Sequence, residues 1–225
     1  MKKYFLFASL LFAWTLTSCD SDDSSDIEPD VPFYQNLGDS YDVTNNKTNV
    51  GANFNKQDSA GINIKLNGPA SILFNGKDPN FANVGIYFYT YSFKGLEDMT
   101  FTFTRAKDEV YTNVASIKDV KPIAIPESFT SAKVKGTTTL TWEGDPVGPN
   151  EVVEVTISYD GGVNSIFNRD EGSRSINITF SNSSLPGKAT LSLSRAKVSP
   201  LQESNGSAGG QLDVSYVQSK EIRLE

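Results

Sequence analysis

Short runs in which every second residue is apolar recur along most of the chain. Ile62, Ile64 and Leu66 form one such run, and residues 153–157, 176–180 and 189–193 show the same alternation. A period of two residues is typical of a β-strand that buries one face. Turn-forming pairs such as Asn75-Gly76 separate the runs, and we find no convincing helical period. The sequence therefore predicts an all-β fold.

Two stretches of the chain resemble each other. Residues 86–107 align without a gap with residues 176–197, and residues 64–75 align with 157–168. Such self-similarity indicates a duplicated unit, and several short antiparallel strands per unit are typical of a two-sheet sandwich. We expect two tandem immunoglobulin-like antiparallel β-sandwich domains, at residues 31–124 and 125–225, with Trp142 in the second core. Pro122 and Pro126 mark the boundary.

The amino-terminal residues have the layout of a secretory signal. Lys2 and Lys3 precede an apolar run over residues 4–16, which is shorter than the roughly 20 residues that span a bilayer. Cys19 follows this run and is the only cysteine of the chain. We therefore expect residues 1–18 to be a signal peptide, and a single cysteine leaves no disulfide within the chain.

The tetrad that ends at Cys19, with Leu16 three residues before the cysteine, resembles the lipobox of bacterial lipoproteins. The resemblance implies that Cys19 carries a diacylglyceryl group and holds the protein on a membrane. The acidic, serine-rich residues 19–30 predict a disordered tether. Their start, residues 20–23, resembles the export signal of Bacteroidetes surface lipoproteins, which implies an outer-membrane, surface-exposed location. The leaflet that carries the lipid stays open.

Charge and composition argue against several classes of function. The formal net charge is −7, and an acidic chain without a basic patch repels phosphate backbones, so we expect no nucleic-acid partner. The chain has no histidine, which removes histidine-based nucleophile pairs and metal sites. We expect no cofactor and no metal. A carboxylate-based glycosidase needs only two acids, but no such pair stands at a recognisable motif.

An aromatic row is the main candidate binding site. Alignment with residues 176–183 predicts that Ile86, Phe88 and Thr90 face inward, which places Tyr87, Tyr89, Tyr91 and Phe93 on the outer face. Exposed aromatic rows mark ligand or partner surfaces. Three interpretations stay open: another part of the protein covers the row, a partner protein docks on it, or a glycan stacks on it. A bulge would instead turn these side chains into the core.

The sequence predicts a non-enzymatic, lipid-anchored binding module of the cell envelope. Its plan resembles that of accessory glycan-binding lipoproteins of Bacteroidetes nutrient-uptake systems, which implies carbohydrate as the ligand. The alternative is a structural or adhesive protein that binds a partner protein, such as a fimbrial subunit or a spacer. Fimbrial subunits of this group mature by cleavage after an early arginine, and the first arginine here is Arg105.

Overall fold

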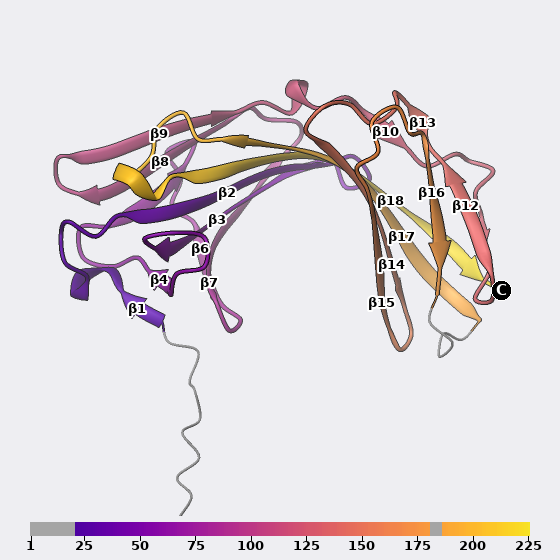
Figure 1. The fold of residues 1–225 in the computed structure, drawn as a ribbon, viewed down its shortest axis with the longest axis horizontal. Helices are drawn as coiled ribbons and strands as arrows, with labels where there is room; N and C mark the ends of the chain where they lie inside the picture. The colour runs from indigo at the N-terminus through magenta and orange to yellow at the C-terminus, as the bar shows by residue number, and fades with distance from the viewer. Residues whose placement is uncertain (1–20, 181–185) are drawn as a thin grey trace, which may run out of the picture.

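The computed structural model describes residues 21–180 and 186–225 and is built from β-strands and three short 3-10 helices (Figure 1). The strands follow from the alternation in the sequence. In β2 (Phe33–Asp42), for example, buried and half-buried residues alternate over the first eight positions. The prediction of an all-β protein is confirmed.

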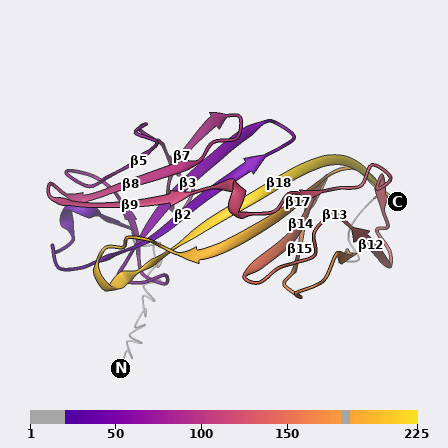
Figure 2. The ribbon, with the colours of Figure 1, turned by 90° about the horizontal axis from the view of Figure 1, so that it is seen from above.

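One sheet of 11 strands extends through the whole molecule. Its strands are, in order of pairing, β1 (Ser21–Asp23), β4 (Asn63–Lys65), β3 (Lys47–Lys56), β2, β18 (Gly210–Leu224), β17 (Gly187–Pro200), β14 (Glu151–Tyr159) and β15 (Gly162–Asn168), with β6 (Asn80–Asn83), β7 (Tyr87–Lys94) and β11 (Ser131–Ala132) attached beside this path. Figure 2 shows β17 and β18 continuing from one half of the molecule into the other.

Three smaller sheets complete the fold. They comprise β5 (Ser71–Phe74), β8 (Met99–Ala106) and β9 (Glu109–Ala115); β12 (Thr137–Thr141) with β16 (Ser175–Thr179); and β10 (Ile123–Ala124) with β13 (Glu143–Gly144). The 3-10 helices are η1 (Ser24–Asp26), η2 (Ile117–Asp119) and η3 (Gly206–Ala208).

Two hydrophobic cores lie along the large sheet. Residues between 27 and 120 line the first core, and residues between 123 and 193 line the second. Strand β18 enters both, because Leu212 and Val214 lie in the first core while Ile222 and Leu224 lie in the second. Apart from β18, buried core residues up to Val120 belong to the first core and those from Ile123 onward to the second. Trp142 is buried in the second core, as the sequence predicts.

Strand order supports the part of the first internal alignment that matches residues 99–106 with 189–196. Strands β5, β8 and β9 are neighbours in one half, and β14, β17 and β18 are neighbours in the other, with antiparallel pairing throughout. The alignment of residues 86–107 with 176–197 places β8 on β17, the central strand of each trio. Their buried residues also match, since Phe101 and Phe103 correspond to Leu191 and Leu193.

The second alignment is wrong. It places β5 on β15, yet β5 pairs with β8, whereas β15 pairs only with β14. The register shows that β14 is the counterpart of β5, because Phe74 lies opposite Phe101 and Ile157 lies opposite Leu191. Short alternating segments between turn residues resemble one another whether or not they are equivalent in the fold.

The segment after Cys19 is folded from Ser21 onward, so the predicted disordered tether over residues 19–30 is wrong for this part. Cys19 and Asp20 lie outside the described residues. Strand β1 pairs in parallel with β4, and its acids contact cations, Asp22 with Lys56 at 3.2 Å and Asp23 with Lys65 at 3.8 Å. Ile27 is buried in the first core. Acidic composition predicts disorder only where the charges find no partners.

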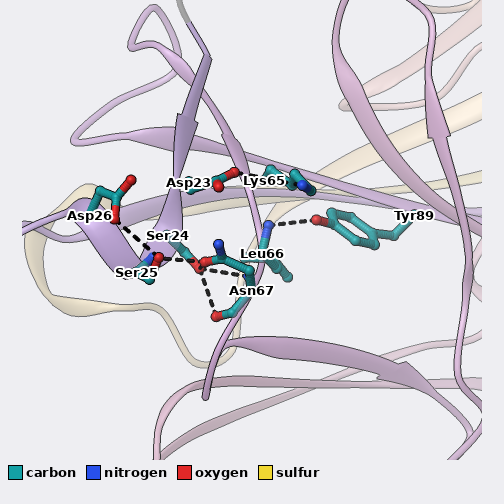
Figure 3. A network of polar contacts seen from close by, with 8 residues as sticks. All are labelled: Asp23, Ser24, Ser25, Asp26, Lys65, Leu66, Asn67 and Tyr89. Carbon is teal, nitrogen blue, oxygen red and sulfur yellow. Dashed lines mark hydrogen bonds and ion pairs between the residues drawn. The ribbon is translucent and has the colours of Figure 1, made fainter.

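Asn67 fastens this segment to the domain (Figure 3). Its Oδ1 accepts a hydrogen bond from the Ser25 main-chain nitrogen at 2.8 Å. Its main-chain nitrogen donates to Ser24 Oγ, also at 2.8 Å, and the buried Ser24 hydroxyl donates back to the Asn67 side chain. On the neighbouring residue, the Leu66 nitrogen donates to the Tyr89 hydroxyl at 2.6 Å. The segment is therefore held by specific polar contacts.

Substitution Asn67→Ala should loosen the amino-terminal segment without unfolding the rest. Removal of Oδ1 leaves the Ser25 nitrogen and the buried Ser24 hydroxyl without this acceptor, at a cost of about 1–3 kcal/mol. Amide hydrogen exchange at Ser25 should become faster, and exchange within β2 and β3 should stay slow. Asn80→Ala, at an exposed asparagine of β6, serves as the control. Equal exchange rates at Ser25 in the two variants would contradict the role of Asn67.

Candidate functional site

The predicted aromatic row faces the first core. Tyr89 is only 6 % exposed, and Tyr91 and Phe93 are half-buried and packed against the same core. Tyr87 is half-buried, and its ring lies 5.7 Å from that of Phe81. The side chains expected to face inward lie on the other face, where Thr90 is exposed. The predicted orientation of this strand is wrong, whereas the ligand-binding role of the four aromatic residues stays a prediction.

The register of β7 explains the reversal. Tyr89 lies opposite Ala52 and Tyr91 opposite Val50, and both partners are core residues of β3. No bulge interrupts this ladder of described residues. In β16, Ile176 and Ile178 are buried, as the sequence predicts. Strand β7 pairs with β3 and β6 in the large sheet, whereas β16 pairs with β12 in a small sheet. The alignment therefore does not match strands in equivalent positions, and the buried face of one does not predict that of the other.

The opposite face of the large sheet carries small and polar side chains. Across the middle strands, Asn36 of β2 lies between Gln211 of β18 and Asn53 of β3. Two positions along, Gly38 lies between Asp213 and Gly51. Facing residues in a sheet share one side, so these two rows of side chains lie next to each other on the same surface.

The two glycines open a hollow in this face, which we call the glycine hollow. Its volume is about 210 Å³. Seven residues contribute to it from the outer side of four strands: Asn36, Gly38, Gly51, Asn53, Phe88, Gln211 and Asp213.

Neither glycine is required by the backbone. The φ angle of both lies outside the left-handed region. A Cβ on Gly38 would meet its nearest atom, Gly51 O, at 4.0 Å, and a Cβ on Gly51 would meet Tyr89 O at 3.7 Å, which are ordinary contacts. Glycine inside a strand weakens it and often marks a place where another molecule approaches the backbone closely. The absence of side chains at both positions leaves open space on this face of the sheet.

The rim of the hollow presents unused hydrogen-bonding groups. The side chains of Asn36, Asn53, Gln211 and Asp213 form no hydrogen bond with any described residue, and they are half-buried or exposed. Burial raises the pKa of the Asp213 carboxyl above its ordinary value, and the Glu154 carboxylate raises it further. Phe88 adds a half-buried ring at one end. The hollow thus offers amide donors and acceptors, one acid and one apolar surface.

The recurring arginines have structural positions. Arg105 is buried with its guanidinium 3.8 Å above the ring of Phe33, and it donates to the main-chain oxygen of Glu28 at 3.2 Å. Arg195 is fully buried, donates to the main-chain oxygen of Asp145 and lies 3.8 Å from Glu151. Each arginine anchors a loop to the equivalent strand of its half.

Within residues 21–180 and 186–225, no group of three acidic, histidine or cysteine side chains is arranged to hold a metal ion. The same residues contain no helix that is long and apolar enough to cross a membrane. Comparison with protein-family models and with curated protein sequences finds no match to this chain. The glycine hollow is therefore interpreted from its own geometry.

Proposed function

We propose that this chain is a non-enzymatic, lipid-anchored binding module of the cell envelope, and that the glycine hollow binds an uncharged glycan. The observation that carries the proposal is the pair of facing glycines, Gly38 and Gly51, whose backbone does not require glycine. Because these two positions have no side chain, a ligand can approach the backbone of the sheet. There it lies beside side-chain amides that have no hydrogen-bond partner among the described residues.

The chemistry of the rim suits sugar hydroxyls. Amide side chains donate and accept at the same time, which matches a hydroxyl that does both. The Asp213 carboxylate can accept hydrogen bonds from further hydroxyls, and the Phe88 ring can cover the apolar face of a sugar. At about 210 Å³, the hollow lies below the roughly 300 Å³ at which pockets for drug-sized ligands begin. One sugar unit of a longer chain is the ligand that this size supports.

The proposal of a lipid anchor on the outer membrane rests on the sequence around Cys19. The structure adds a compatible feature, because Ser21, two residues after the cysteine in the sequence, is already paired in a strand. A surface lipoprotein of this kind would present the hollow to polysaccharides outside the cell, which fits a role in nutrient uptake.

Affinity electrophoresis against a panel of polysaccharides tests the glycan site. The protein used is the chain from residue 20 onward, which keeps all described residues. We expect one neutral polysaccharide to retard it. Gly51→Leu should weaken the affinity at least about tenfold, equivalent to about 1.4 kcal/mol, because its side chain fills the space that the ligand would occupy. Gly51→Ala, which adds only a methyl group, should fold at least as well as the parent and bind more weakly.

Thr190→Leu is the matched control, since Thr190 is exposed on the same face of the sheet in the other half of the molecule. Its retardation should equal that of the parent chain. A glycan that binds the parent and Gly51→Leu equally would locate the site elsewhere. If no glycan binds, the result supports the alternative of a spacer or adhesive subunit, which the unbroken course of β17 and β18 through both halves favours.

A further inference from the structure

A group of apolar side chains is exposed beside the entry point of the chain. We call it the apolar tip and define it as Ile62, Phe81, Val84 and Ile86. Their exposed fractions are 37 %, 48 %, 75 % and 40 %. Val84 and Ile86 form the turn between β6 and β7, where the Val84 nitrogen donates to the Ile86 oxygen at 3.2 Å. Clusters of exposed apolar residues mark contact surfaces.

Hydrogen bonds bring this tip next to the first described residues. Ser21 pairs with Asn63 in the parallel ladder of β1 and β4, and Asn63 Oδ1 accepts from the main-chain nitrogen of Tyr87. Ile62 precedes Asn63 and Ile86 precedes Tyr87, so both lie within one residue of these contacts. Figure 1 shows β1, β4, β6 and β7 gathered at the end of the molecule where the chain enters.

The two acids of β1 are paired with lysines. The protein as a whole is acidic, but Asp22 and Asp23 of β1 contact Lys56 and Lys65. An apolar surface next to paired charges can approach a lipid headgroup region without the repulsion that an uncompensated acidic face would meet.

We infer that the apolar tip inserts into the surface of the lipid bilayer that holds the chain. This inference rests on the proposed attachment at Cys19, which lies two residues before β1. With so short a connection, the residues around Ser21 stay within a few residue lengths of the headgroups. Apolar side chains at this depth bury their surface in the boundary between headgroups and acyl chains. The bilayer is thus the occupant of this surface, and the contact fixes the orientation of the protein on the membrane.

Fluorescence quenching tests the contact. The chain from Cys19 onward is coupled through its thiol to a maleimide lipid in phosphatidylcholine vesicles, some of which contain brominated acyl chains. Trp142 is its only tryptophan and is buried. Val84→Trp adds a reporter at the apolar tip. Val114→Trp adds one at an exposed valine near the end of β9 that leads to η2, away from the hairpin end of β9 that borders Ser24 and Ser25. Both substitutions are at exposed positions, and melting curves verify folding.

Brominated lipid should quench the added emission of Val84→Trp several-fold more than that of Val114→Trp. Addition of Ile86→Glu to Val84→Trp should abolish the difference. Equal quenching at the two positions, or quenching at neither, would overturn the inference. The chemical linkage makes this result independent of acylation in the cell. Acylation is read separately from the mass of the protein isolated with membranes, so a failure of the proposed lipid anchor and a failure of the tip contact are distinguishable.

Discussion

Substitution Trp142→Ala should lower the free energy of unfolding by about 3–5 kcal/mol, the range for loss of a large buried aromatic side chain. Trp142 is 1 % exposed in the second core, and its Nε1 donates to the main-chain oxygen of Asp145 at 3.0 Å. The substitution leaves both a cavity and a carbonyl without this donor. Urea denaturation followed by far-UV circular dichroism measures the loss.

The same variant should destabilise both halves of the molecule. Strand β18 contributes to both cores and pairs with β17 along 14 residues, so unfolding of the second core removes support from a strand on which the first depends. We expect one transition, with faster hydrogen exchange in β2 and β3 as well as in β14. Phe54→Ala, in the first core, should have the reciprocal effect. Loss of protection confined to the second half would show that the two cores unfold independently.

Stability should fall as the pH rises from about 4 to about 7. Asp39 is fully buried in the first half, and neither of its carboxyl oxygens has a hydrogen-bond partner among the described residues. Burial, together with the smaller effect of the negative charge of Asp98, raises the pKa of Asp39 from 3.8 to about 7. Across this window the folded chain keeps a proton that the unfolded chain loses, so rising pH favours unfolding.

The effect should be large. A difference of about three pKa units corresponds to on the order of 4 kcal/mol, present in full below the window and lost above it. Asp39→Asn carries no proton to lose and should flatten the dependence of the unfolding free energy on pH. Asp108→Asn, at an exposed acid, should leave it unchanged. Equal slopes in the two variants between pH 4 and 7 would exclude Asp39 as the cause.

The sequence predicts the strands well because alternation reports directly which face of a strand is buried. Trp142 and the buried residues of β16 follow from it. The alternation of apolar residues could not predict that one sheet connects both cores. The parallel pairing of Leu212 with Leu37 joins residues far apart in the chain, and alternation contains no information about partners.

The sequence could not predict which way the aromatic row faces, for a related reason. Both faces of β7 carry bulky side chains, and only the register with Val50 and Ala52 determines which face is buried. The glycine hollow had a signal, since Gly38 and Gly51 both interrupt alternating runs. That the two glycines lie opposite each other depends on the β2–β3 register. The order of residues 21–30 depends on Lys56, Lys65 and Asn67, which composition does not reveal.

The parallel pairing of β1 with β4 has a mechanical consequence. A pull on the chain before Ser21 acts along the axis of β1, so the contacts between the strands and the ion pair of Asp22 with Lys56 bear load together rather than one after another. Behind them, the contacts of Ser24 and Ser25 with Asn67 resist the same displacement. Under the proposed function, tension on a bound glycan would reach the lipid anchor through β1 and β4 and would load their pairing in shear. A short strand resists tension best in this geometry.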